Sequence, residues 1–368
     1  MNWGELITLE YGKPVKDKEA TDGKVPVYGT NGQIGTSHLP AQCKHPSFIL
    51  GRKGAYRGVH YSDCPFSVID TAFYAEPLTD RIDLKWAYYK FLTYDINGMD
   101  SGSAIPSTDR YQIYSIEVEV PPLEKQRKIV AVLDCIDRKI NINQKVNDNL
   151  EQQAQAIYHE RFETVSPNDL PSDWRIVTLG EVATISNKSF NPLKEPEILL
   201  EHYSIPAFDE VRFPVFELST SIKSNKFIID ASCFMISKLN PTTKRVWKPY
   251  CLTGNAVCST EFIVYKAKDK TITDFLYSVI DSNSFSDFMC SHVTGSTGSR
   301  QRTTPSDTLS YELILPSGDE LAEFQSLVSP MYAQIRINAI ENDRLKRLRD
   351  SLLPKLMSGE IDVSTIQL

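Results

Sequence analysis

The sequence predicts a mixed α/β protein built from two copies of one unit, and three observations support this fold class. Two long amphipathic stretches carry the same hydrophobic seam in the same register. Short motifs outside these stretches recur in the same order. With 368 residues, the chain is long enough for two globular domains and the elements that link them.

The two seams follow alternating steps of four and three residues, which is the heptad pattern of a coiled coil. The first seam consists of Ile129, Leu133, Ile136, Ile140, Asn143, Asn147, Leu150, Ala154 and Ile157. The second consists of Phe324, Val328, Met331, Ile335, Asn338, Asn342, Leu345, Arg349 and Leu352. Because the two asparagines also coincide, the match favours a tandem duplication, the kind of repeat that decides the fold before any other signal.

The duplication extends into the globular parts of the chain. Residues 4–9 (GELITL) resemble residues 180–185 (GEVATI). Each copy continues through a helical pattern, a run of small polar residues and an alternating strand that ends in proline. The offset between copies grows from 176 (Gly4 to Gly180) to 195 (Ile129 to Phe324), so the second copy contains insertions.

Between these motifs, short apolar or alternating runs predict strands, although the strand order does not follow from them. The predicted strands are 47–50, 66–69, 116–120, 226–229, 233–236, 261–265 and 312–316. Asp80 or Asp83 is expected to cap a helix that reaches about Tyr94, and Thr273 one that reaches about Ile280.

Each seam predicts a long helix. The first begins at Pro121-Pro122 and ends near Phe162, giving a rod of roughly 60 Å. The second ends at about residue 357, where Gly359 can cap it, unless Pro354 kinks or ends it sooner. We favour antiparallel pairing of the two helices, with asparagine opposite asparagine and a pseudo-two-fold axis. The alternative is that each helix packs only on its own domain.

The composition excludes several classes of protein. There is no run of 18 apolar residues and no signal peptide at the N-terminus, which predicts a cytoplasmic protein. The seven cysteines show no CxxC spacing, so we expect reduced thiols and no metal site.

Catalytic signals are weak. Residues 240–243 (NPTT) partly match the Asn-Pro-Pro-aromatic signature of amino methyltransferases, but they lack the second proline and the aromatic residue. No nucleophile-base spacing or phosphate-binding loop is present in the sequence, and we expect no catalytic or cofactor-binding residue in the chain. A DNA methyltransferase with its own cofactor site stays an alternative.

Basic, glycine-rich or polar loops predict a nucleic-acid surface in each copy. Residues 51–58 (GRKGAYRG) and 238–248 (KLNPTTKRVWK) combine cations with an aromatic residue, and Arg and Gln are able to recognise base edges. The candidates for DNA contact are Thr30, Asn31, Arg52, Lys53, Tyr56, Arg57, Ser101, Ser103, Asn240, Thr242, Thr243, Lys244, Arg245, Trp247, Thr294, Ser296, Arg300, Gln301 and Arg302. The net charge of −7 implies modest affinity for DNA unless partners add cationic surface.

The motifs taken together resemble the specificity (S) subunits of Type I restriction-modification enzymes. Residues 120–129 (VPPLEKQRKI) resemble the opening of the family's spacer helix, and residues 352–361 (LLPKLMSGEI) its terminal segment. Further similar runs are 26–32, 153–157, 170–174 and 179–182. The second copy departs from the family because residues 316–319 (PSGD) lack the Pro-Pro-Leu-Glu opening.

The resemblance implies a non-catalytic subunit whose two target-recognition domains each recognise half of a bipartite DNA site. It also implies two modification (methyltransferase) subunits on the helices and two restriction (motor-nuclease) subunits, with S-adenosylmethionine, ATP and Mg²⁺ on those partners. A recognition subunit of another methylase-nuclease system is a second alternative. The expected parts are a first recognition domain, a spacer helix, a linker, a second recognition domain, a second spacer helix and a tail, at 1–120, 121–162, 163–173, 174–315, 316–358 and 359–368.

Overall fold

The computed structural model describes residues 1–99, 106–294 and 301–366. The chain divides into two compact units: unit 1 is Met1–Lys139 with Leu345–Leu368, and unit 2 is Ile140–Arg344. The mixed helix and sheet class predicted from the sequence is confirmed. No helix among the described residues is long and apolar enough to cross a membrane.

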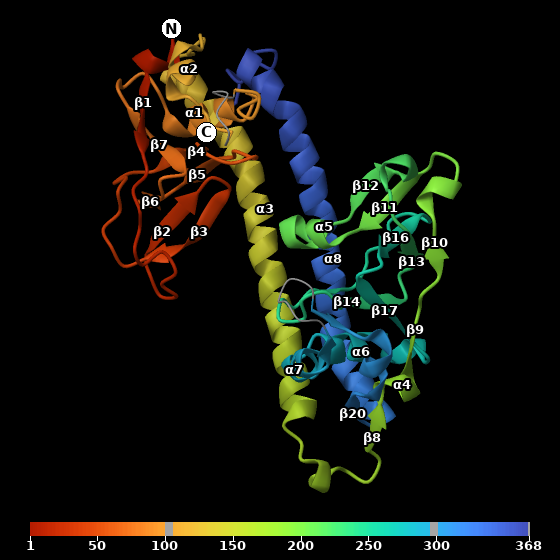
Figure 1. The fold of residues 1–368 in the computed structure, drawn as a ribbon. Helices are drawn as coiled ribbons and strands as arrows, with labels where there is room; N and C mark the ends of the chain where they lie inside the picture. The colour runs from red at the N-terminus through yellow and green to blue at the C-terminus, as the bar shows by residue number, and fades with distance from the viewer. Residues whose placement is uncertain (100–105, 295–300, 367–368) are drawn as a thin grey trace. The chain divides into compact units, whose positions relative to one another are not determined.

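Unit 1 contains two sheets, the helices α1 and α2, the first part of α3 and the last part of α8 (Figure 1). The first sheet has the order β1-β7-β4-β5 and the second the order β3-β2-β6. The elements are β1 (Ile7–Tyr11), β2 (Val25–Gly29), β3 (Gly32–Ser37), β4 (Ser47–Gly51), β5 (Val59–Ser62), β6 (Ser67–Val68), β7 (Ala72–Pro77), α1 (Leu84–Phe91), α2 (Arg110–Ser115) and the first part of α3 (Leu123–Tyr158).

Helix α1 begins where the sequence predicts, because the Asp83 carboxylate accepts hydrogen bonds from the backbone N–H groups of Lys85 and Trp86. Its apolar face covers the first sheet, where Trp86 and Phe91 pack with Phe48 of β4 in one buried cluster. This cluster fixes β4 and therefore the loop that follows it.

Unit 2 repeats this plan with a larger second sheet, of order β10-β13-β16-β11-β12, and a first sheet of order β9-β17-β14-β15. The strands are β8 (Arg175–Thr178), β9 (Ala183–Ile185), β10 (Ser189–Phe190), β11 (Leu199–Tyr203), β12 (Val215–Leu218), β13 (Lys226–Ile228), β14 (Cys233–Ser237), β15 (Val246–Trp247), β16 (Ala256–Ser259), β17 (Phe262–Ala267), β18 (Val293–Thr294), β19 (Arg302–Thr303) and β20 (Glu312–Leu315). The helices are α4 (Leu179–Val182), α5 (Ile205–Val211), α6 (Thr273–Ile280), α7 (Asn283–Ser291) and α8 (Gly318–Ser358), together with the second part of α3.

The first sheets of the two units have the same strand order and register. Ile49 of β4 pairs with Tyr74 of β7, and Met235 of β14 pairs with Val264 of β17. Each sheet is also preceded by a short helical turn closed by a capping box, Asn2 with Glu5 and Thr178 with Glu181. The internal repeat seen in the sequence therefore has a counterpart in strand topology.

The second sheets explain why the second copy is longer. In unit 1, β2 pairs with β3 antiparallel and with β6 parallel, and in unit 2 β11 pairs in the same way with β12 and β16. Unit 2 then adds β13 and β10 beyond β16. The insertions predicted from the growing offset thus lie in an enlarged second sheet.

The long helices α3 and α8 contribute to both units, and within each unit their seams meet. In unit 1, Ile129 and Leu133 of α3 share a buried cluster with Leu353 and Leu356 of α8. In unit 2, Ala154 and Tyr158 of α3 share a cluster with Phe324 and Val328 of α8.

The asparagines of unit 2 meet across these helices. Asn143 donates to the Asn342 side-chain oxygen at 2.8 Å, and Asn338 donates to that of Asn147 at 2.8 Å. Three of these four side chains are buried. A buried amide without a hydrogen-bond partner would destabilise the fold, and the pairing avoids this cost. These two asparagine pairs join α3 to α8 within unit 2.

The remaining predicted seam residues differ in burial. Ile129, Leu133, Ile136, Ile140, Asn143, Val328, Asn338 and Asn342 are buried, and the half-buried ones are Asn147, Leu150, Met331, Ile335, Leu345 and Leu352. Helix α8 continues past Pro354, and also past Pro330, to Ser358. Gly359 follows it with φ +78°, the left-handed conformation expected of a helix cap.

One strand prediction is wrong: residues 116–120 form no strand, and only Glu117 makes an isolated bridge to Asn2. The run was predicted from its alternation alone. Its apolar side chains do not extend a sheet; Val118 instead lies buried in the cluster that contains Ile129 and Leu133 of α3.

Candidate nucleic-acid interface

The basic loop of unit 1 follows β4 and is fixed by backbone hydrogen bonds. Gly51 N–H donates to the Gly58 carbonyl at 2.8 Å and closes the loop. Gly54 N–H donates to the Pro106 carbonyl at 3.0 Å, and Thr108 N–H donates to the Arg52 carbonyl at 2.8 Å. These two bonds form a short ladder between residues 52–54 and 106–108, which we call the unit 1 ladder.

The basic loop of unit 2 follows β14, the strand equivalent to β4, and has the same frame. Ser237 N–H donates to the Arg245 carbonyl at 2.9 Å. Asn240 N–H donates to the Gln301 carbonyl at 3.0 Å, and Thr303 N–H donates to the Lys238 carbonyl at 3.1 Å. This unit 2 ladder joins residues 238–240 to 301–303. The two loops chosen for their composition therefore occupy equivalent positions.

Both ladders place a residue with positive φ at the same step. Gly54 has φ +128° and Asn240 has φ +48°. Glycine adopts such a conformation freely, and asparagine is among the few other residues that tolerate it. The turn chemistry of the two loops is therefore conserved between the copies although their sequences differ.

The described unit 1 candidates around the ladder differ in exposure: Asn31 and Tyr56 are exposed, whereas Thr30, Arg52 and Lys53 are half-buried. Tyr56 is 65% exposed, and Lys53 makes no side-chain hydrogen bond or ion pair with any described residue. The Arg52 guanidinium donates to the Asp70 carbonyl and lies 4.9 Å from the ring centroid of Tyr11. Arg52 is thus held in place while its charge has no carboxylate partner among the described residues.

The neighbouring turn supports this loop. The Thr30 hydroxyl donates to the carbonyls of Lys53 and Thr71, both at 2.8 Å. The Asn31 side chain, with its amide assigned so that nitrogen faces acceptors, donates to the carbonyls of Thr30 and Tyr56. Thr30 and Asn31 therefore position the loop.

Arg57 needs a correction, because its side chain is only 2% exposed. Its guanidinium points inward and donates to the carbonyls of Gly54, Ile96 and Asn97. A cation committed to buried carbonyls has no access to DNA phosphates or bases in this conformation. Composition selected the loop but could not show the direction of this side chain.

In unit 2 the predicted cations are paired with carboxylates. Lys244 lies 3.0 Å from Asp281, and Arg245 forms a bidentate pair with Asp209 at 2.6 and 2.9 Å. Burial raises the pKa of Asp281, and Lys244 opposes that shift. These cations are therefore partly neutralised within the protein.

Further unit 2 candidates separate into exposed and buried residues. Thr242 and Thr243 are exposed at the tip of the loop. Trp247 needs a correction: it is 3% exposed and packs edge-on against Tyr203 and Phe208, as expected of a core aromatic residue. Trp247 therefore supports the loop from the core side.

The third predicted segment is described only in part. Arg302 lies in β19 and makes a bidentate pair with Glu261 at 3.0 and 3.1 Å, which raises the pKa of Arg302. Gln301 is half-buried beside it, and Thr294 is exposed on the paired strand β18. The candidates Ser101, Ser103, Ser296 and Arg300 lie outside the described residues.

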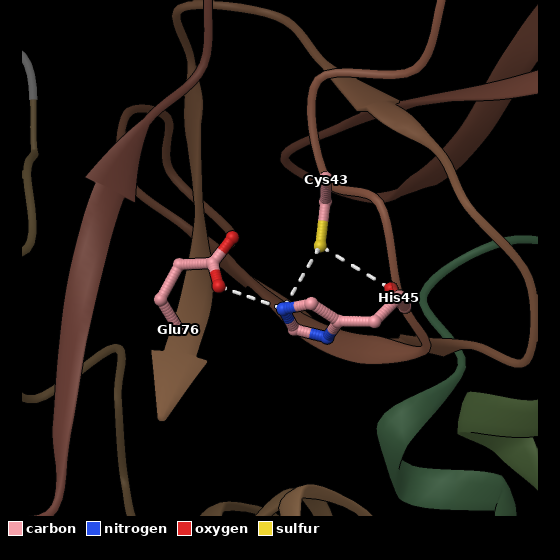
Figure 2. A group of neighbouring side chains, drawn as sticks. All are labelled: Cys43, His45 and Glu76. Atoms are coloured by element: carbon pink, nitrogen blue, oxygen red, sulfur yellow. Dashed lines mark hydrogen bonds and ion pairs between the residues drawn. The ribbon is translucent and has the colours of Figure 1, made fainter. Parts of the chain in front are cut away.

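One other group of side chains has chemistry that the cysteine spacing did not reveal. Cys43, His45 and Glu76 lie together in unit 1, with one donor atom of each within 4.8 Å of the others (Figure 2). The expectation of no metal-ligating cluster rested on sequence spacing, but Glu76 comes from a different strand. The three are therefore candidates to hold a metal ion.

The sequence model of the family described as "Type I restriction modification DNA specificity domain" matches residues 2–152. This match confirms the resemblance inferred from the motifs. It includes all of the unit 1 loop and ladder.

Two specificity subunits are similar to most of the chain. The chain is 24% identical over 320 residues to the Type I restriction enzyme MjaIX specificity subunit of Methanocaldococcus jannaschii, covering 78% of this chain and 71% of the relative. It is 21% identical over 362 residues to the HindI specificity subunit of Haemophilus influenzae, covering 74% of each.

A solved structure shares the fold. The S subunit of a Type I restriction-modification system from M. genitalium matches with a TM-score of 0.60 at 16% identity, covering 97% of this chain and 95% of that one. At this identity the likeness concerns the fold alone.

Unit 1 also has a cationic and aromatic group next to the loop, which composition did not single out. The Arg110 guanidinium lies 4.9 Å from the ring centroid of Tyr11 and 5.2 Å from that of Tyr111, which is 65% exposed. Tyr11 is therefore shared by Arg110 and Arg52. The adjacent Arg110-Tyr111 pair was a usable signal in the sequence, since stacked Arg and Tyr are typical of nucleic-acid surfaces.

Proposed function

We propose that the chain is the non-catalytic DNA sequence-specificity subunit of a Type I restriction-modification system. The observation that carries this proposal is the repeated ladder: equivalent loops, rich in cations and polar residues, follow equivalent strands of two sheets. A protein that recognises two half-sites needs one such surface in each copy. The match to the specificity-domain model and the two similar specificity subunits agree with this role.

The contacts we propose are divided between positioning and recognition. Lys53, Arg52 and Arg110 would hold phosphates in the first half-site, since cations without carboxylate partners bind the backbone at least cost. Tyr56, Thr242 and Thr243 are exposed at loop tips and would approach the bases. Gln301 and Arg302 have the side-chain types that recognise adenine and guanine edges.

The finer architecture is also a proposal. Target-recognition domains at 1–120 and 174–315 would be separated by α3 and α8, which act as antiparallel coiled-coil spacers with pseudo-two-fold symmetry. Modification subunits would dock on these helices, and restriction subunits would join for cleavage. S-adenosylmethionine, ATP and Mg²⁺ would then be bound by those partners. The asparagine pairs of unit 2 support this arrangement because they fix the register of the two helices.

A domain exchange tests the proposal. Replacing residues 1–120 with the same region of a relative, and sequencing the methylated bases in cells that also express the modification subunit, should change one half of the methylated motif only. The reciprocal exchange of residues 174–315 is the matched control and should change only the other half. A change in both halves from either exchange contradicts separate recognition.

The same preparation separates this function from a methyltransferase with its own cofactor site. The purified chain should bind duplex DNA without binding S-adenosylmethionine in calorimetry. Cofactor binding and methyl transfer by the chain alone would replace the proposal with the enzyme. The methylated motif together with a cleavage assay separates it from a recognition subunit of another methylase-nuclease system.

A further inference from the structure

Three donor side chains of different chemistry converge where β4 begins and β7 ends (Figure 2). Cys43 is fully buried, and the His45 and Glu76 side chains are 36% and 33% exposed. The His45 Nε2 atom lies 2.6 Å from Glu76 Oε2 and 3.9 Å from Cys43 Sγ. None of these residues belongs to the DNA surface described above.

Both ring nitrogens of His45 face hydrogen-bond acceptors. Its Nδ1 atom lies 3.0 Å from the Pro46 carbonyl oxygen, while Nε2 faces the Glu76 carboxylate. A neutral imidazole has one N–H, so it satisfies only one of these two acceptors. Either a second proton on the ring or a metal ion between Nε2 and the carboxylate resolves the conflict.

We propose that Cys43, His45 and Glu76 form a zinc-binding site in unit 1. A thiolate, an imidazole nitrogen and a carboxylate are the three ligand types that Zn²⁺ takes in proteins, and sulfur disfavours Mg²⁺ and Ca²⁺. The Pro46 carbonyl has the outer-sphere role found at such sites, because it fixes the ring so that Nε2 faces the metal. The partial exposure of His45 and Glu76 leaves water as the fourth ligand.

The rearrangement that zinc requires is small. Bonds of about 2.0–2.3 Å in a tetrahedron place donor atoms roughly 3.3–3.7 Å apart. The Glu76 carboxylate must therefore rotate away from Nε2, and the Cys43 sulfur must approach by a few tenths of an ångström. The thiol proton, and any second proton on His45, pass to solvent, so that thiolate and neutral imidazole ligate the ion.

Unit 2 supports the proposal by what it has at the equivalent place. The strand registers align Glu76 of β7 with Lys266 of β17. The Lys266 ammonium pairs with Asp230 at 2.5 Å, so unit 2 supplies a cation from its own side chain. Unit 1 instead has a carboxylate, an imidazole and a thiol, which is a set of donors for an external cation.

The position of the site indicates a structural role. It lies at the start of β4, whereas the loop of residues 52–58 follows the end of that strand, five residues away. At about 3.3 Å per residue this separates the zinc from the loop by roughly 17 Å. The metal would link the segment before β4 to β7 and stabilise the sheet from which the loop extends.

Metal content and cobalt substitution of the untagged full chain test the proposal. We expect one zinc ion per chain, and one Co²⁺ ion after exchange, with the near-ultraviolet charge-transfer absorption of a single thiolate ligand. Zinc at about 100 times its Kd should raise the Tm of unit 1 by on the order of 5 °C. Cys43→Ser should abolish the thiolate band, and Glu76→Gln should weaken Co²⁺ affinity by more than about tenfold.

Matched controls use residues of the same types outside the cluster. Cys64→Ser removes an exposed thiol, and His38→Ala removes a histidine that pairs with exposed Asp22; both should bind Co²⁺ as the unaltered chain does. Absence of stoichiometric Zn²⁺ or Co²⁺ binding by the unaltered chain overturns the proposal, and no variant needs to fold for that result. So does a thiolate band that survives in folded Cys43→Ser.

Discussion

Residues 52–58 in unit 1 and 238–245 in unit 2 have the same backbone frame but hold their charges differently. In unit 1, Arg52 lies on an aromatic ring and Lys53 has no ion pair with a described residue. In unit 2, Lys244 and Arg245 each face a carboxylate. The ladder is thus what the two copies share, while the electrostatics of each loop are separate, as expected of surfaces that recognise different sequences.

The difference has a consequence for binding. A cation without a carboxylate partner gains the whole interaction with a phosphate and releases a counterion. A cation in an ion pair must first lose its carboxylate, which reduces the free energy gained on binding DNA. Such a cation therefore favours only DNA whose phosphates or bases replace the lost interaction. We therefore expect unit 1 to provide more of the salt-dependent affinity and unit 2 a smaller share.

The largest expected effect concerns stability and tests the equivalent positions 57 and 244. Arg57→Ala leaves the carbonyls of Gly54, Ile96 and Asn97 without their donor. We expect this to lower the free energy of unfolding by about 3 kcal/mol. Lys244→Ala removes one hydrogen-bonded partner of Asp281, whose side chain is 16% exposed, and should cost about 1–2 kcal/mol, because the Asp281 carboxylate can take up a proton when its cation is lost. Urea unfolding gives both values, and hydrogen exchange should localise the Arg57 effect to unit 1. Equal costs would remove the distinction between the loops.

The next effect concerns the salt dependence of DNA binding. Lys53→Ala should lower affinity for all duplexes alike and reduce the slope of log K against log salt by about 0.9, the value for one phosphate contact. Lys244→Ala should change the slope by less than half as much, because Asp281 already neutralises that ammonium. Fluorescence anisotropy over a salt series, with the modification subunit present, measures both. A larger change for Lys244→Ala contradicts the comparison.

These residues also show how far the sequence predicts the site. The two basic loops were identified from composition, and the structure places them at equivalent strands because composition and chain order survive in a duplicated fold. The Asp83 cap and the helical seams were predictable because they depend on neighbours a few residues away.

What the sequence did not predict depends on distant partners. The inward direction of Arg57 is set by carbonyls 39 and 40 residues along the chain, and the pairing of Arg302 by Glu261, 41 residues away. The cluster of Cys43 and His45 with Glu76 needs a strand pairing of the same kind. Such contacts follow from sheet register, and the strand order could not be derived from the alternating patterns.

A smaller effect concerns pH at the position where unit 2 has Lys266 and Asp230. Burial opposes ionisation of Asp230, but its hydrogen bonds from Lys266 and Ser232 prevail and lower its pKa from 3.8 to about 2. The stabilisation is therefore complete above pH 3.8 and disappears as the pH falls through about 2. Because the Asp230 side chain is 56% exposed, Asp230→Asn should cost below about 1 kcal/mol at pH 7. Unfolding curves at pH 7 and near pH 2 check this; a cost that persists in acid refutes the assignment to the ion pair.

The smallest effect concerns Arg302, where the protein and the DNA would compete for one guanidinium. Glu261→Gln removes the charge of its bidentate partner while keeping the side-chain size, and should cost a few tenths of a kcal/mol in stability because the Arg302 side chain is 43% exposed. If Arg302 contacts the second half-site, the same change should strengthen DNA binding about two- to threefold, since less ion pairing is lost on binding. Anisotropy with cognate duplex and with duplexes altered in each half-site measures this gain. It should disappear in the double variant Glu261→Gln with Arg302→Ala, because the gain acts through Arg302. If the gain in affinity persists in the double variant, it comes from the change in net charge and not from Arg302. Thr242 and Thr243 would then be the contacts to test in unit 2.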